Sequence, residues 1–433
     1  MKIRRLPELH IEGYKEISIL NEPIEYLKPK SVFLPTEFPV PLTLKVNPGD
    51  HVKFGQMVME REGRFSHPIL SPISGVVKGV VKRWHQSNKM MPMLEIENDF
   101  MEDMVDDFKN LEPDKMSRKE LIELMKMTGL VGMGGAGFPA YAKYDTDKKV
   151  DMLIINLAEC EPFITCDYTS VYYNAEMLVY GLRYMLKAAD CNKAVIAIKD
   201  KSINKPLLDK LIPLLDNTMS IHYLKDVYPA GWERYTVEQC SGKTYKVLPI
   251  EAGVIVSNAS TCLSFANTLK YGIPPSMKYV TFTGDSIKNP GNVLCKCGTN
   301  ITDLLPLFGG LKDGISRENA TLIAGGPMTG SSMFSEDFVT SMTLGAVIII
   351  KDKLEGRVTP HCLGCGTCAK YCPVFLSPYE IKRVMKTGNV EELKELQVTK
   401  CIQCGLCSYV CPSRIDLTAS VLTAKDLVRK LGR

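Results

Sequence analysis

Residues 362–373 read CLGCGTCAKYCP, and residues 401–412 repeat the same cysteine pattern as CIQCGLCSYVCP. Both segments follow C-x2-C-x2-C-x3-C-P, the spacing typical of proteins that hold two [4Fe–4S] clusters. Three thiolates spaced in this way lie on one tight loop and can wrap one face of an iron–sulfur cube. The fourth cysteine, followed by proline, turns toward the other cube. The pattern therefore predicts two clusters that exchange their fourth ligands.

The eight cysteines divide into two expected ligand sets. Cluster 1 is expected to be held by Cys362, Cys365, Cys368 and Cys411, and cluster 2 by Cys401, Cys404, Cys407 and Cys372. The alternative is a pair of zinc sites, but zinc sites usually combine two separated C-x2-C pairs. Two neighbouring clusters indicate single-electron transfer without naming a donor or an acceptor. Between the motifs, residues 378–398 predict two short amphipathic helices broken at Gly388.

The composition sets the protein class around these motifs. The chain has 433 residues and a net charge of +4, so we expect two to four domains and no strong electrostatic attraction for nucleic acid. No apolar run approaches the roughly 18 residues of a membrane span, and residues 1–16 lack the apolar core of a secretory signal. The 15 cysteines, eight of them in the two motifs, favour metal binding in a reducing, cytoplasmic compartment over a disulfide framework.

A glycine-rich segment is the best candidate for a flavin site. One-electron centres commonly exchange electrons with two-electron carriers through a flavin. Residues 129–143 read GLVGMGGAGFPAYAK, in which five glycines would let backbone N–H groups approach a phosphate or a flavin edge. Lys143 adds a positive charge. The alternative is that the glycines only form turns.

Polar residues follow two apolar stretches of buried-strand length. Residues 150–158 (VDMLIINLA) lead into Glu159-Cys160-Glu161, and residues 252–256 lead into Ser257-Asn258. Ligands of α/β sheets bind outside the carboxyl ends of the strands. A turn at residues 228–233 (YPAGWE) adds an aromatic ring and a carboxylate. Together with the glycine-rich segment, these features indicate one cofactor site.

In the order and spacing of these motifs, the sequence resembles the C subunit of the Rnf electron-transport complex (RnfC). It also resembles related proline-reductase-associated and cobalamin-reductase-type flavoproteins and, more distantly, the NADH-oxidising FMN subunit of respiratory complex I. The resemblance implies a multidomain α/β and α+β fold. Its parts would be a barrel-sandwich hybrid (1–110), a Rossmann-like FMN/NADH-binding α/β domain (111–275), a β-grasp module of the SLBB type (276–310), a return segment to the flavin domain (311–354) and a dicluster ferredoxin domain (355–433).

The resemblance also implies roles for individual residues. The glycine loop and Lys143 would cradle the FMN phosphate, Asn156, Glu159 and Asn258 would contact the flavin or its ribityl chain, and Phe138 and Glu161 would face a nicotinamide nucleotide. The complete set of expected cofactor-binding residues is Gly132, Gly134, Gly135, Gly137, Phe138, Lys143, Asn156, Glu159, Glu161, Tyr228, Gly231, Ser257 and Asn258.

The function implied by the resemblance is that of an NADH-dependent oxidoreductase subunit with FMN and two [4Fe–4S] clusters. Its partners would be Rnf-type membrane subunits, with the chain on the cytoplasmic face of the membrane. Residues 10–15 and 232–234 depart from the usual Rnf pattern, which keeps open a soluble reductase that serves a dedicated enzyme such as proline reductase or a corrinoid system. A third possibility is a non-catalytic iron–sulfur relay with a vestigial flavin site.

Two further features call for interpretation. Residues 31–99 predict a small barrel of hairpins, similar to biotinyl and lipoyl domains. The hairpin at residues 60–71 has no lysine to carry a swinging cofactor, so we expect this domain only to dock. Cys295 and Cys297 form a C-x-C pair that we interpret as ordinary thiols, with a redox-active dithiol as the alternative.

Overall fold

Two antiparallel sheets form the first domain of the computed structural model, which describes residues 9–19, 21–37, 40–351 and 361–431. One sheet has the order β2 (Ser31–Pro35), β8 (Lys89–Asn98), β7 (Gly75–His85) and β4 (His51–Val52); the other has β3 (Thr43–Leu44), β5 (Met57–Arg61) and β6 (His67–Leu70). Alternate side chains such as Val32, Val58 and Ile96 fill the space between the sheets. The predicted barrel of hairpins is confirmed.

The second domain is built on a parallel sheet with the order β11 (Met219–Leu224), β10 (Ala194–Lys199), β9 (Met152–Asn156) and β12 (Val254–Asn258). Both faces are buried. Leu153 and Ile155 pack with helices on one side, and Met152 and Ile154 pack with α6 (Glu233–Ser241) on the other. The helices of the first side are α1 (Arg118–Met127), α2 (Tyr141–Tyr144), α3 (Cys166–Tyr173), α4 (Ala175–Ala189), α5 (Lys205–Leu211) and α7 (Ala259–Tyr271).

The third domain is a mixed sheet that extends beyond the predicted β-grasp boundaries. Its order is β1 (Ile24–Tyr26), β14 (Gly291–Lys296), β13 (Met277–Thr283), β17 (Ala346–Lys351), β15 (Ala320–Ala324) and β16 (Ser331–Met333), with α8 (Ile301–Leu304) beside it. Residues 311–354 therefore do not simply return the chain to the flavin domain, because β17 pairs with β13 and completes this sheet. Likewise β1, predicted within the barrel domain, pairs with β14.

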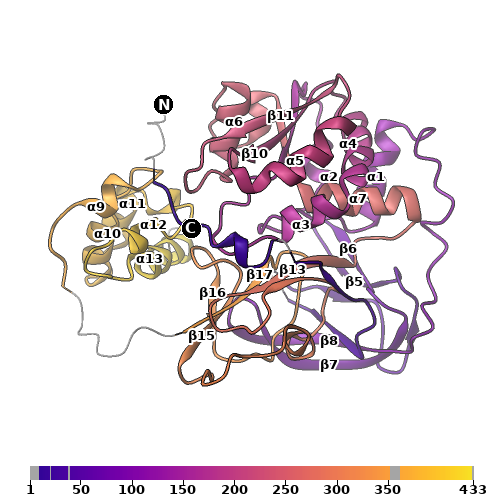
Figure 1. The fold of residues 1–433 in the computed structure, drawn as a ribbon, viewed down its shortest axis with the longest axis horizontal. Coiled ribbons are helices and arrows are strands. Elements are labelled where there is room, and N and C mark those ends of the chain that lie inside the picture. Colours follow the sequence, from indigo (N-terminus) through magenta and orange to yellow (C-terminus); the bar gives the residue numbers. More distant parts are fainter. Residues whose placement is uncertain (1–8, 20, 38–39, 352–360, 432–433) are drawn as a thin grey trace.

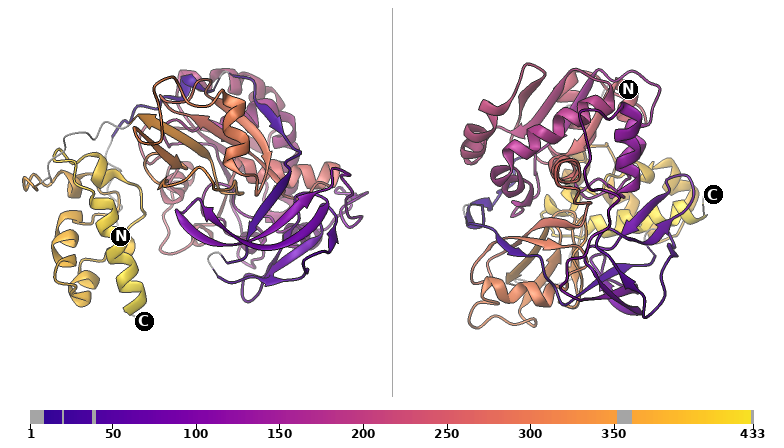
Figure 2. Two further views of the ribbon diagram at one scale, coloured as in Figure 1. Left: turned by 90° about the horizontal axis from the view of Figure 1, so that it is seen from below. Right: turned by 90° about the vertical axis from the view of Figure 1, so that its right-hand side faces the viewer.

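The cysteine motifs lie in a helical domain at one end of the molecule, drawn in yellow in Figures 1 and 2. It contains α9 (Thr367–Lys370), α10 (Pro378–Met385), α11 (Val390–Glu395), α12 (Leu406–Tyr409) and α13 (Leu417–Leu431). Gly388 separates α10 from α11 with a left-handed φ of 67°, so the predicted break is confirmed. In the part of the chain that the structure describes, no helix combines the length and the apolar character needed to cross a bilayer.

Helices α4 and α7 pack so closely that they require a glycine. A Cβ built on Gly181 would lie 2.8 Å from both the Cβ of Ala266 and the carbonyl oxygen of Cys262. Helix propensity alone favours alanine over glycine by about 1 kcal/mol. Overpacking a core costs about 1–3 kcal/mol, so the packing cost should outweigh the gain in propensity.

We therefore expect Gly181→Ala to destabilise the protein, measured as a lower urea midpoint of the anaerobically purified chain. A higher midpoint would show that the two helices are not packed as described.

Candidate functional site

A cavity of about 550 Å³ opens at the carboxyl ends of β9 and β12. It is lined by the glycine loop (residues 132–138), by the segments that follow the two strands, and by residues of the mixed sheet and of the helical domain. Every cofactor-binding residue expected from the sequence lines this cavity except Gly137. A Cβ on Gly137 would lie 3.4 Å from the side chain of Thr343, which lines the cavity. The structure thus brings the separate sequence motifs together in one place.

The glycine loop is held by its own backbone and by the first turn of α7. The Gly132 N–H donates to the Phe138 carbonyl (2.8 Å), and the Met133 N–H donates to Oγ1 of Thr261 (2.9 Å). Gly135 has a φ of 119°, which a residue with a side chain rarely adopts. A Cβ on Gly134 would lie 3.2 Å from Asn258, the residue that caps α7. These contacts explain why the loop needs glycine and how it stays open to the cavity.

Lys143 lies at the edge of the cavity and already has partners. Its ammonium donates to the Val256 carbonyl (2.8 Å) and lies 3.7 Å from the Glu233 carboxylate. Asn156 is also engaged, because its amide donates to the Gly231 carbonyl (2.9 Å) and its oxygen accepts from the Ala158 N–H (3.1 Å). Asn156 therefore ties the end of β9 to the 228–231 turn.

A buried carboxylate cluster forms the floor of the site. Glu159 accepts from the Asp167 N–H (2.8 Å) and pairs with Lys15 (3.4 Å), which lies on the short 3-10 helix η1 (Lys15–Ile17). Burial raises the pKa of Glu159 to about 7, although Lys15 opposes the shift. Asp167 in turn accepts from Asn258 (2.7 Å) and Ser260 (2.6 Å).

Glu161, expected to face a nicotinamide, is held by a loop of the mixed sheet. Its carboxylate accepts from Oγ1 of Thr329 (2.5 Å) and from the Met328 N–H (3.1 Å), and the Tyr228 hydroxyl lies 3.5 Å away. Burial raises the pKa of Glu161. The loop comes so close that any side chain on Gly326 would overlap the carboxylate. Glu161 therefore joins the two domains at the cavity wall.

The barrel domain reaches the mouth of the same cavity. Phe65, in the β5–β6 hairpin, packs edge-on against Phe138 with ring centroids 5.0 Å apart. At the tip of the β7–β8 hairpin, Gln86 donates to Thr343 (2.8 Å), another lining residue. The β5–β6 hairpin, which corresponds to the cofactor-carrying hairpin of lipoyl-type domains, here packs against the glycine loop through Phe65.

Sequence reasoning missed two lysines beside the cavity. Lys15 comes from a segment more than a hundred residues away in the chain, and Lys278 comes from β13. Neither lies in a motif, so no local pattern could have identified them. Asp167 had a recognisable signal, since it follows the same strand end as Glu159 and Glu161.

Each predicted set of four cluster ligands surrounds a cavity of its own. Cys362, Cys365, Cys368 and Cys411 line one of about 240 Å³, and Cys372, Cys401, Cys404 and Cys407 line one of about 20 Å³. Among the described residues, no three His, Cys, Asp or Glu side chains converge closely enough to hold a single metal ion. Four cysteines around one cavity can each bind a different iron atom of an iron–sulfur cube.

Hydrogen-bond donors accompany the cysteine sulfurs. The N–H groups of Gly364 and Leu376 approach the sulfurs of Cys362 and Cys372 (both 3.3 Å), and the Thr367 hydroxyl donates to Cys365 (3.2 Å). Such donors stabilise negative charge on the sulfurs and raise the reduction potential of a bound cluster. The two loops therefore supply hydrogen-bond donors to sulfurs that are expected to hold the clusters.

The four cysteines expected to hold cluster 2 adjoin the large cavity directly. Cys404 and Ile402 line both the large cavity and the cavity of cluster 2. Any side chain on Gly405 would overlap the Met328 carbonyl, so the second cysteine loop can lie this close to Met328 only with a glycine at position 405. By contrast, Cys362 and Cys365 of cluster 1 are exposed, and Leu363 between them is 73% exposed. The cysteines expected to hold cluster 2 thus lie inside, and Cys362 and Cys365 of the set expected for cluster 1 lie outside.

Cys295 and Cys297 show no sign of a reactive dithiol. Both thiols are buried, and burial raises the pKa of each of them, that of Cys297 to about 12. The sulfur of Cys297 contacts that of Met342 (2.8 Å). Thiols held protonated in this way are poor nucleophiles, which favours their interpretation as ordinary buried cysteines.

Comparison with known families identifies the same four domains. Residues 8–101 match the RnfC barrel sandwich hybrid domain, residues 125–267 the Nuo51 FMN-binding domain, residues 279–332 the SLBB domain, and residues 361–416 a 4Fe-4S dicluster domain. The fold class expected from the sequence is confirmed. FMN and two [4Fe–4S] clusters are the cofactors of such domains.

Several curated proteins are similar over most of their length. The C subunit of the proton-translocating ferredoxin:NAD(+) oxidoreductase complex of Clostridium ljungdahlii is 31% identical over 386 residues, 87% of this chain and 83% of the relative. The C subunit of the Na(+)-translocating complex of Acetobacterium woodii is 31% identical over 382 residues, 85% and 84% of the two chains. A cobalamin reductase of Salmonella typhimurium is 31% identical over 281 residues, 61% and 60% of the two chains.

A solved structure supports the fold at lower similarity. A chain of an NAD+-reducing [NiFe]-hydrogenase in the H2-reduced state superposes with a TM-score of 0.51 at 16% identity. The match covers 74% of this chain and 64% of the hydrogenase chain. At this identity the likeness concerns the arrangement of the elements and not the chemistry.

The ligand sets make a quantitative prediction. Anaerobically purified protein should contain about eight iron atoms per chain, because two four-iron clusters are expected. Cys365→Ser should weaken only cluster 1 and Cys404→Ser only cluster 2, resolved by electron paramagnetic resonance of the reduced protein. Cys295→Ser is the matched control and should leave the iron content unchanged. A wild-type content of about four would contradict the cross-ligated pair.

Glu159 should make the stability of the flavin domain depend on pH. Its pKa of about 7 in the folded chain lies above the usual value of about 4.3, so the folded state binds the proton more tightly. The stabilisation is complete below the unfolded pKa and is lost as the pH rises through 7. Its full size is about 4 kcal/mol, from about 1.4 kcal/mol per pKa unit.

The measurement compares urea midpoints of the wild type and Glu159→Gln between pH 5 and pH 8. The variant should lose less stability than the wild type as the pH rises. Equal losses would show that Glu159 does not titrate in this range.

Proposed function

Because the chain belongs to the RnfC family of electron-transport subunits, we propose that it exchanges a hydride with NAD(H) at FMN in the glycine-loop cavity and relays single electrons through its clusters. FMN supplies the conversion between two-electron and one-electron chemistry. The glycine loop and α7 bind and orient the cofactor. Cys372, Cys401, Cys404 and Cys407 would hold cluster 2 beside the flavin cavity, and Cys362, Cys365, Cys368 and Cys411 would hold cluster 1 nearer the surface, where the clusters would supply one-electron transfer toward a partner protein.

The observation that carries this proposal is the position of Cys404. This ligand of cluster 2 is also part of the wall of the flavin cavity. Tyr228, Leu406 and Ile11 form a buried apolar cluster at this junction, with Cys160 and Cys404 packed against it. Apolar packing excludes water between the two sites, which keeps the cofactors close and the electron path short.

The outer position of cluster 1 supports contact with an electron-transfer partner. Its ligands Cys362 and Cys365 are exposed, and they are flanked by the exposed Leu363. The relatives are C subunits of ion-translocating complexes, so we propose Rnf-type membrane subunits as partners and a peripheral position on the cytoplasmic face of the membrane. The direction of electron flow follows from the reduction potentials of donor and acceptor.

A second candidate is a soluble RnfC-like reductase that delivers electrons to a dedicated enzyme, such as proline reductase or a corrinoid protein. The similarity to a cobalamin reductase favours this candidate. Anaerobic affinity purification from the native cells separates the two: recovery of integral membrane subunits supports the Rnf assignment, whereas recovery of one soluble acceptor enzyme supports the alternative.

A non-catalytic relay with a vestigial flavin site is tested by direct reduction. Under anaerobic conditions, NADH should bleach the flavin absorbance first and then the absorbance of the clusters. Protein with a full iron content but no bound flavin and no NADH-dependent dye reduction would support the vestigial site and contradict our proposal.

The junction at Gly405 provides a sharper test of the electron path. Gly405 and Gly366 occupy the same position in the two cysteine motifs and have similar φ angles of 77° and 71°. An alanine at either position therefore meets the same backbone strain of about 1–2 kcal/mol. Only at Gly405 would the new Cβ overlap a neighbour, the Met328 carbonyl; a Cβ on Gly366 would have no atom within 4 Å among the described residues beyond its own chain neighbours.

We expect Gly405→Ala to slow NADH-driven reduction of the clusters while leaving flavin reduction and iron content intact. Gly366→Ala is the matched control and should leave both reduction steps intact. Stopped-flow absorbance resolves the two steps. Equal effects of the two substitutions would contradict a path through the Gly405 junction.

A further inference from the structure

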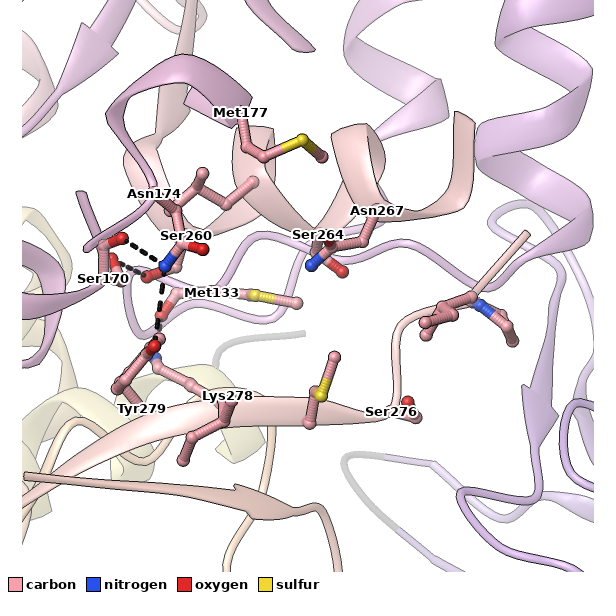
Figure 3. Close-up of a pocket in the computed structure, with 15 residues that line it drawn as sticks. Met133, Ser170, Asn174, Met177, Ser260, Ser264, Asn267, Ser276, Lys278 and Tyr279 are labelled. Atoms are coloured by element: carbon pink, nitrogen blue, oxygen red, sulfur yellow. Dashed lines mark hydrogen bonds between the residues drawn. The ribbon is translucent and has the colours of Figure 1, made fainter. Parts of the chain in front are cut away.

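Lys278 is a buried lysine in the wall between two cavities. It lies on β13, is only 5% exposed, and lines both the flavin cavity and a neighbouring cavity of about 150 Å³. Figure 3 shows its side chain leaving the strand toward Met133 of the glycine loop. Its ammonium donates to the carbonyls of Met133 (2.6 Å) and Met342 (3.2 Å).

The positive charge of Lys278 has no counter-ion in the described part of the chain. The ammonium makes only the two carbonyl contacts and no ion pair. The titratable groups that sense its charge are the thiols of Cys166, Cys295 and Cys297, and burial raises the pKa of each of them, so they stay neutral. An ammonium removed from water is costly unless an anion accompanies it. An anionic ligand in the adjoining cavity would balance this charge.

The other two lysines at the cavity differ in this respect. Lys143 has the Glu233 carboxylate at 3.7 Å, and Lys15 has Glu159 at 3.4 Å. Because each of these two lysines has a carboxylate partner, neither needs a ligand to balance its charge. Lys278 is thus the lysine around the described cavity whose charge remains to be balanced.

The surroundings of Lys278 suit a phosphate. Met133, which accepts its hydrogen bond, is tied by its own N–H to Thr261 in the first turn of α7. The N-terminus of this 13-residue helix and the glycine-loop amides both favour an anion. The side-chain donors of Asn258 and Ser260 already serve Asp167, so loop amides and the ammonium remain for a ligand.

We propose that Lys278 supplies the positive charge that binds the phosphate of FMN at the glycine loop. This role was expected for Lys143, whose charge is instead shared with Glu233. The inference rests on the proposed function, in which the flavin occupies this cavity.

The test compares two flavins that differ only in the phosphate. Deflavinated protein is titrated with FMN and with riboflavin, and binding is measured by quenching of flavin fluorescence. Losing one charged hydrogen bond corresponds to about a 10- to 100-fold loss of affinity. Lys278→Met should show such a loss for FMN and nearly unchanged affinity for riboflavin, whereas Lys278→Arg should retain the preference for FMN.

Lys296→Met is the matched control. Lys296 lies on the adjacent strand opposite Met277, on the other face of the sheet, with its ammonium 4.0 Å from the centre of the Phe54 ring. It does not line the flavin cavity, so this variant should bind both flavins as the wild type does. If Lys278→Met does not fold, as judged by melting temperature and iron content, Lys278→Gln replaces it, because glutamine also removes the charge but keeps a hydrogen-bond donor for the two carbonyls.

Three outcomes would overturn the inference. An equal loss of affinity for FMN and for riboflavin would mean that Lys278 contacts the isoalloxazine ring or only maintains the shape of the cavity. Unchanged FMN affinity would mean that the phosphate lies elsewhere. Wild-type protein that binds neither flavin would reject the proposed function itself, which distinguishes that failure from failure of the Lys278 assignment.

Discussion

The contact between Gly405 and the Met328 carbonyl is the constraint on which the arrangement of the cofactor sites depends. Because Gly405 has no side chain, the second cysteine loop packs directly against the Met328 carbonyl in the loop of the mixed sheet. The adjacent Cys404, a proposed ligand of cluster 2, then becomes part of the wall of the flavin cavity as well as of the cavity between the four cysteines. A larger residue would move the loop outward and open a gap between the two redox sites.

The flavin cavity is shared among all the domains. The parallel sheet provides the strand ends and the glycine loop, the mixed sheet provides Lys278 and the loop that holds Glu161, and the helical domain provides Cys404. The barrel domain supports the mouth through Phe65 and Gln86. Because each wall belongs to a different unit, the affinity and the potential of the bound cofactor depend on how the domains pack.

The sequence predicted the local parts of this arrangement well. The cysteine motifs, the helix break at Gly388 and the strands within residues 150–158 and 252–256 were recognisable because each depends on neighbours a few residues away. The place of β17 in the mixed sheet was not foreseen for residues 311–354, because β17 gains it by pairing with β13, more than sixty residues earlier in the chain. Such long-range pairing leaves no local pattern.

By itself, the sequence predicted the ligand sets of the two clusters and the glycine loop, since the spacing of cysteines and glycines within a dozen residues limits how the backbone can turn. Only the tertiary structure decided which charges surround the flavin cavity. Lys143 is paired with Glu233, Lys15 arrives from the N-terminal segment, and Lys278 has no carboxylate partner among the residues that the structure describes. The physical reason is that a local motif fixes backbone geometry, whereas the balance of buried charge depends on which distant segments pack together.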